Sequence, residues 1–173
     1  MTNEILFVTN KKEEKILRKK TALFDFKKFT AKEVRDLVTR MRKIMRAANG
    51  IGLSANQIGL DLRMFVAEIP DADGGTKFYS IFNPVVEKID GEKKLLEEGC
   101  LSVPGKYGNV ERATRVTVSG FDKYGKPVRI KAWGLLAHVF QHEIDHLNGI
   151  VFIDKAKQVF ENDQAAPAKT EKK

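Results

Sequence analysis

The feature that most constrains this chain is the motif H-E-x-x-H at His142-Glu143-Ile144-Asp145-His146. Residues 133–148 have the pattern of a helix, and Gly149 is its stop signal. Four residues of α-helix make about one turn, so both imidazoles lie on one face and can chelate one metal ion. Glu143 then lies beside that ion, within reach of a bound water. Apolar residues flank the motif on several faces, which favours a metal site at the floor of a cleft over an exposed helix with incidental histidines.

A catalytic metal usually takes three protein ligands and a water, so two imidazoles need a third donor. Cys100 is the only cysteine of the chain and lies in a glycine-hinged turn, EGCLS, at residues 98–102. A lone cysteine is also often a small buried apolar residue. On these residues alone, the ligand role and the core role of Cys100 are evenly matched.

A third segment, residues 50–57, reads GIGLSANQ. Glycine at alternate positions, followed by small residues and an amide, indicates backbone packed close to another group, with Gln57 as a possible hydrogen-bond donor. The segment is not a phosphate-binding loop, because it follows a helix and has no downstream Gly-Lys-Ser/Thr.

The rest of the chain predicts an α+β fold, with antiparallel sheets packed around the central metal-binding helix. A capping box at Thr30 begins a helix with apolar residues at i, i+3, i+4 and i+7, and Asn49-Gly50 ends it. We expect one domain over residues 1–157 and a polar, flexible tail over residues 158–173. The predicted strands are residues 62–69, 78–82 and 85–89, followed by a hairpin of 115–121 and 127–132.

Composition narrows the class of protein. The 173 residues suit one domain, and no apolar run approaches the roughly 18 residues of a membrane span. The beginning of the chain lacks a signal-peptide pattern, and the single cysteine fits a reducing cytosol, so we expect a cytoplasmic protein with no membrane partner. The net charge of +8 could indicate a nucleic-acid partner. Its signs are interspersed, however, which favours a solvated surface and no specific nucleic acid.

The three segments, in their order and separations, resemble the peptide deformylase family over roughly residues 1–155. The resemblance implies that Cys100, His142 and His146 hold the metal. It also implies that Glu143 is the general acid/base of an amide hydrolysis.

The same resemblance assigns the substrate contacts. Gln57 and the backbone N–H of Leu101 would polarise the formyl oxygen. Three further residues would hold the substrate peptide through their backbone as an added strand: Ile51, Gly52 and Gly99.

Three positions complete the comparison with the family pattern. Ser54 stands where the family usually has alanine, and both residues are small. Glu98 and Arg112 resemble a family ion pair that fixes the cysteine turn. His138 lies one turn before His142, where it is a fourth metal ligand or, in the simpler interpretation, an exposed or pocket-rim histidine.

The implied activity is removal of the N-formyl group from the N-terminal formylmethionine of newly synthesised polypeptides, with release of formate. One divalent metal ion is implied: Fe²⁺ in the cell, with Zn²⁺, Ni²⁺ or Co²⁺ possible in purified protein. We expect a monomer that acts on N-formylmethionyl peptides and contacts the ribosome transiently. The long C-terminal helix of some members, implicated in ribosome docking, is missing from this sequence.

Two other classes of protein remain open. One is an H-E-x-x-H metalloprotease with Glu161 as its third ligand. The other is a non-enzymatic, ribosome-associated protein with a structural metal site. Structural sites usually have four protein ligands, and only His138 could supply the fourth.

Overall fold

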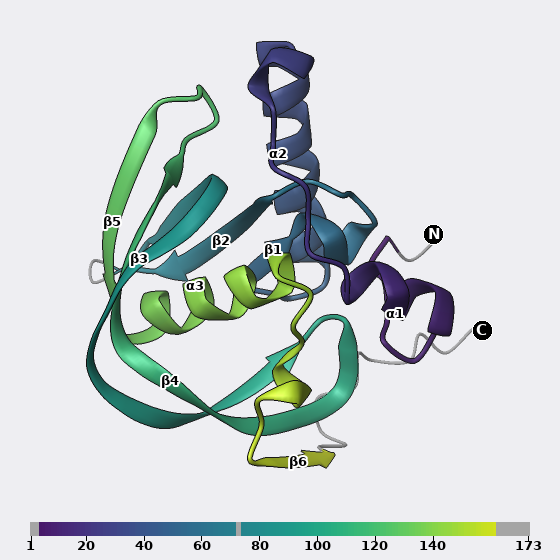
Figure 1. Cartoon of the computed structure of the whole chain (residues 1–173), viewed down its shortest axis with the longest axis vertical. Coiled ribbons are helices and arrows are strands. Elements are labelled where there is room, and N and C mark those ends of the chain that lie inside the picture. The colour runs from purple at the N-terminus through teal and green to yellow at the C-terminus, as the bar shows by residue number, and fades with distance from the viewer. Residues whose placement is uncertain (1–3, 72–73, 162–173) are drawn as a thin grey trace.

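The fold is a curved antiparallel sheet bent around one helix (Figure 1). The computed structural model of the protein describes residues 4–71 and 74–161. Within those residues the elements are α1 (Lys11–Leu17), α2 (Ala31–Ala47), β1 (Gly52–Ser54), β2 (Met64–Pro70), β3 (Thr76–Cys100), β4 (Val103–Phe121), β5 (Pro127–Trp133), α3 (Gly134–Leu147) and β6 (Gln158–Glu161). Short 3₁₀ turns lie at Phe26–Lys28, Ala55–Ile58 and Phe152–Asp154.

The sheet has six strands among the described residues, in the order β1-β2-β3-β4-β5, with β6 paired to β4. Every pairing is antiparallel, which confirms the predicted α+β class. The predicted hairpin is present, with Arg115 opposite Trp133 and Phe121 opposite Pro127. The predicted strands 78–82 and 85–89, however, belong to one strand, β3. A register shift between Phe82 and Val85 bends β3 without ending it.

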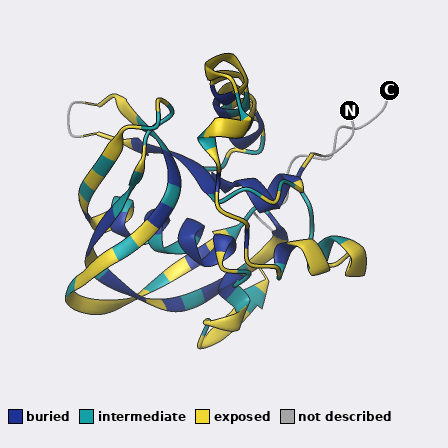
Figure 2. Ribbon diagram, turned by 45° about the horizontal axis from the view of Figure 1, so that its top comes forward, coloured by how far each residue is buried: buried dark blue, intermediate teal, exposed yellow. Residues whose placement is uncertain are grey.

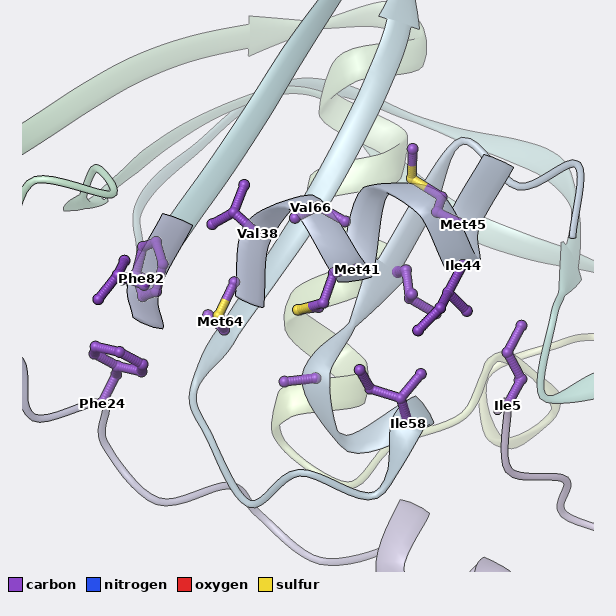
Figure 3. Packing of buried hydrophobic residues seen from close by; sticks show 13 residues of the cluster. Ile5, Phe24, Val38, Met41, Ile44, Met45, Ile58, Met64, Val66 and Phe82 are labelled. Carbon is purple, nitrogen blue, oxygen red and sulfur yellow. The ribbon is translucent and has the colours of Figure 1, made fainter. Parts of the chain in front are cut away.

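The helix α2 begins where its capping box predicts. The Glu33 backbone N–H donates to the Thr30 hydroxyl at 3.2 Å, and the Thr30 backbone N–H donates to the Glu33 carboxylate at 2.7 Å. Its apolar stripe packs on β2 and the turn after β1, as Figure 3 shows for Met41 and Met45. Both methionines are fully buried, so the stripe is core.

The helix α3 is held by a second cluster on the inner face of the sheet. Phe140 meets Phe65 of β2 edge to face, with ring centroids 5.3 Å apart. Ile144 and Leu147 are buried in the same cluster. Figure 2 shows buried positions on α3 and on the strands that face it. A helix buried on several sides places its motif residues in the interior, as the apolar residues around the motif predict.

The strand β6 lies within the predicted tail, residues 158–173. Residues 158–161 pair with β4, with Gln158 opposite Asn109 and Glu161 opposite Lys106. The Phe160 ring also stacks on Tyr107. A four-residue strand is stabilised by the edge it joins, so its own sequence shows no extended apolar period. Residues 162–173, the rest of the predicted tail, lie outside the described residues.

No helix within residues 4–71 and 74–161 has both the length and the apolar character needed to cross a membrane.

Candidate metal centre and active site

Three side chains converge where α3 passes the end of β3. The Cys100 Sγ lies 3.1 Å from His146 Nε2, which lies 3.2 Å from His142 Nε2. The three ligand atoms are all within 4.8 Å of one another. Two nitrogens bound to one tetrahedral ion at about 2.0–2.1 Å are about 3.3 Å apart. The observed separation of the imidazole nitrogens therefore fits a shared divalent ion.

The orientation of His142 is set by a buried carboxylate. His142 Nδ1 lies 2.8 Å from Glu98 Oε2, and because a carboxylate only accepts, Nδ1 is the donor. The neutral ring then has its lone pair on Nε2, the atom that faces the other two ligands. A carboxylate behind a ligating histidine fixes the ring and raises its basicity.

Glu98 is in turn paired with Arg112, as the resemblance predicts. Arg112 Nε and Nη2 donate to the two carboxylate oxygens at 2.6 and 3.0 Å. Arg112 also donates to Asp145 on α3, which ties the cysteine turn to the helix. Burial alone would raise the pKa of Glu98, but hydrogen bonds from His138, His142 and Arg112 outweigh it. They hold the pKa of Glu98 well below its usual range, so the carboxylate is ionised.

The two candidate histidine ligands titrate differently. Burial, and then the positive charge on His142, hold the pKa of His146 well below its usual value. Burial opposes the charge on His142 too, but contacts with Cys100 and Glu98 outweigh it and raise the pKa of His142. A charged histidine must lose the proton on its ligating nitrogen to become a ligand, so metal binding at His142 has to release the Nε2 proton while Nδ1 keeps its hydrogen bond to Glu98.

The carboxyl group of Glu143 lies in the same place and is almost fully buried, at 2% exposure. Oε2 accepts a hydrogen bond from the Ser54 hydroxyl at 2.6 Å. Oε1 lies against Gly52, where an added Cβ would be 2.3 Å away. Burial raises the pKa of Glu143, against the opposing effects of the His142 charge and the Ser54 hydrogen bond. A raised carboxyl pKa suits a group that both accepts and returns a proton near neutral pH.

Gln57 approaches the cysteine from the turn after β1. Its Oε1 accepts from the Ser54 backbone N–H at 2.9 Å, which fixes the amide orientation. Its Nε2 donates to the Ser102 hydroxyl at 3.1 Å and lies 3.6 Å from Cys100 Sγ. The donor end of the amide therefore points at the candidate metal ligands.

A cavity of about 810 Å³ opens onto this group. His138 lines it and bonds to Glu98 Oε1 at 2.8 Å, so His138 is a rim residue outside the Cys/His/His group. Glu161 lies apart from that group, in β6 opposite Lys106. Other predicted site residues that line the cavity are Ile51, Gly52, Gln57, Gly99, Leu101 and Glu143.

Sequence reasoning missed two contacts at this site. Ser54 bonds directly to Glu143, although its small size alone suggests no role. Asn56 Nδ2 donates to the backbone carbonyl of His146 at 2.6 Å. Their partners on α3 are 89 and 90 residues away along the chain, so no local pattern signals either contact.

Comparison with known proteins agrees with the geometry. The family described as polypeptide deformylase matches residues 6–162. A peptide deformylase of Halothermothrix orenii is 46% identical over 130 residues, which are 75% of this chain and 82% of that protein. A probable peptide deformylase from Synechococcus phage S-SSM7 is 37% identical with a TM-score of 0.78, covering 87% of this chain and 97% of that one. The peptide deformylase of Synechococcus elongatus, solved in complex with actinonin, is 34% identical with a TM-score of 0.78. That match covers 89% of this chain and 78% of the S. elongatus chain. The match over nearly all of the described residues places this chain in the polypeptide deformylase family.

Proposed function

We propose that this chain removes the formyl group from N-formylmethionyl peptides by metal-dependent hydrolysis, releasing formate and a free amino terminus. The observation that carries the proposal is the convergence of Cys100, His142 and His146 within 4.8 Å. The carboxyl group of Glu143 lines the cavity beside them. A general acid/base beside a metal ion held by three protein ligands can catalyse the hydrolysis of an amide.

Cys100, His142 and His146 would hold one divalent ion, which when bound would supply Lewis-acid activation of the attacking water. A thiolate and two imidazoles suit soft or borderline metals. We propose Fe²⁺ as the ion in the cell, with Zn²⁺, Ni²⁺ or Co²⁺ as substitutes in purified protein.

Glu143 would handle the proton in both halves of the reaction. Its carboxylate takes a proton from water as the water oxygen adds to the formyl carbon. The same group then gives that proton to the methionine nitrogen as the carbon–nitrogen bond breaks. The products are formate and a free amine.

Gln57 and the backbone N–H of Leu101 would stabilise the negative charge that develops on the formyl oxygen. An amide nitrogen carries two hydrogens, and the Ser102 hydroxyl accepts one from Gln57. The second hydrogen is directed at Cys100 Sγ, 3.6 Å from Nε2, and the formyl oxygen would lie beside that sulfur.

The peptide would lie along the cavity as an added strand. Among the described strands, β1 pairs with β2 alone, so its other edge could pair with a peptide. Ile51 and Gly52 line the cavity on that side, and Gly99 lines it from β3. Their backbone groups are our candidates for the peptide contacts.

The test compares two products of the metal-loaded protein. We expect formate from formyl-Met-Ala-Ser and no amine release from an internal peptide bond. Metal analysis after dialysis should show that Cys100→Ala loses the ion while Glu161→Ala retains about one ion per chain. Internal peptide cleavage together with the reverse metal pattern would instead assign the chain to the metalloproteases.

A further inference from the structure

The strand β1 contacts both oxygens of the Glu143 carboxyl group. Residues two apart in a strand face the same side, so Gly52 and Ser54 both face α3. Glycine leaves the space that Oε1 occupies, since a Cβ there would be 2.3 Å from that oxygen. The Ser54 hydroxyl lies 2.6 Å from Oε2. One strand therefore provides space for one oxygen and a hydrogen bond for the other.

From this contact we propose that Ser54 is a positioning residue for deformylation, whose hydroxyl fixes the direction in which the Glu143 carboxyl group points. The inference rests on the proposed function, because it assigns Ser54 a role through the general acid/base of that reaction. Ser54 is fully buried, so water does not compete for its hydroxyl. Among the described residues none donates a hydrogen bond to Oε1, which leaves Ser54 as the group that defines the carboxyl orientation.

The Ser54 hydroxyl has a second acceptor in reach. It lies 2.9 Å from the backbone carbonyl oxygen of Glu143, and a hydroxyl donates only one hydrogen at a time. When the carboxylate is ionised, the hydroxyl can donate to Oε2. When Glu143 carries the proton, the carboxyl O–H can donate to Ser54 Oγ while the hydroxyl donates to the backbone carbonyl. Ser54 can therefore stay bonded to Glu143 throughout the cycle.

Alanine, the usual residue of the family pattern here, would fill most of the same space but make neither bond. The carboxyl group would then be free to rotate above Gly52, and fewer molecules would hold it in the reactive direction. Misplacement of a reacting group by a fraction of an ångström is enough to slow a reaction severalfold. The effect should appear in kcat, since Ser54 is not among the residues that line the cavity.

The test uses the metal-loaded full chain with formyl-Met-Ala-Ser as substrate. We expect Ser54→Ala to lower kcat about tenfold, which is about 1.4 kcal/mol of activation free energy. KM should stay within about twofold of the wild-type value, and metal content should not change. Ser54→Thr retains the hydroxyl, so it should recover most of the lost kcat.

A matched control separates positioning from simple packing. The Thr21 hydroxyl is also buried and also bonds α3, donating to the Leu147 carbonyl at 3.1 Å, but it does not touch Glu143. Thr21→Val should lower the melting temperature and leave kcat unchanged.

Each result decides the inference. Wild-type kcat in Ser54→Ala, an equal loss in Thr21→Val, or a folded, metal-bound Ser54→Thr no faster than Ser54→Ala would each overturn it. Should Ser54→Thr fail to fold, the comparison of Ser54→Ala with Thr21→Val decides alone. If the metal-loaded wild type released no formate, the proposed function would be refuted instead. That result differs from an active wild type with an equally active Ser54→Ala, which would refute only the role of Ser54.

Discussion

Replacing Arg112 with methionine should destabilise the fold far more than an equivalent change at the surface. Arg112 is 3% exposed and donates two hydrogen bonds to Glu98, whose side chain is 1% exposed, and one to Asp145. Methionine fills similar volume but leaves the Glu98 carboxylate buried without its guanidinium. Asp145 keeps Lys155 as a partner, so the main loss falls on Glu98. Removing one partner of a buried ion pair costs about 3–5 kcal/mol.

The control for this prediction is Arg129→Met. Arg129 bonds Glu87 at 2.6 Å, but its side chain is 57% exposed, and such surface pairs contribute about 1 kcal/mol or less. Urea unfolding of wild type and the two variants measures both losses in the free energy of unfolding. The dependence of that free energy on urea concentration should be the same in all three proteins. Equal losses for Arg112→Met and Arg129→Met would refute the claim that the buried pair holds the cysteine turn to α3.

Two further predictions concern the cavity wall and acid stability. Gly52→Ala should lower kcat by at least tenfold with metal retained, because its Cβ would collide with Glu143 Oε1, and wild-type kcat would contradict the proposed carboxyl position. Hydrogen bonds from Arg46 and Arg42, against burial, hold the pKa of Glu68 well below its usual value of 4.5. A carboxyl group whose pKa is lowered by folding stabilises the fold fully above its unfolded pKa. That stabilisation is lost progressively as the pH falls from the unfolded pKa through the folded pKa. Wild type should therefore lose more stability than Glu68→Gln between about pH 6 and pH 3 in urea titrations, and parallel curves would contradict this.

The features that could be predicted from the sequence are those whose residues lie close together along the chain. The capping box at Thr30 and the H-E-x-x-H motif each lie within a few residues, so periodicity and spacing predict both helices. The roles of Gln57 and Cys100 needed the family resemblance, because neither a single amide nor a lone cysteine shows from its local sequence whether it faces a metal site. His146 is 46 residues from Cys100, and only the fold brings their side chains to 3.1 Å.

The long arms of β3 and β4 were harder to predict. No strand was predicted between residues 90 and 114, where most β3 positions are exposed and no face alternates clearly. The extended conformation of these residues is stabilised by pairing between β3 and β4, as between Lys93 and Ala113. The short strand β6 has the same origin, since residues 158–161 are ordered by the edge of β4. Pairing between distant segments leaves little trace in either segment alone.

Formate release by wild type, Gln57→Leu and Glu143→Ala, on preparations of equal metal content, tests the central claim most directly. Gln57→Leu should lose about 10²–10³ in turnover, since it removes one donor to the developing oxyanion. Glu143→Ala should lose at least as much, because it removes the group that moves the proton in both halves of the reaction. Both variants should still hold one ion per chain. Wild-type turnover in a metal-bound Glu143→Ala would contradict the account.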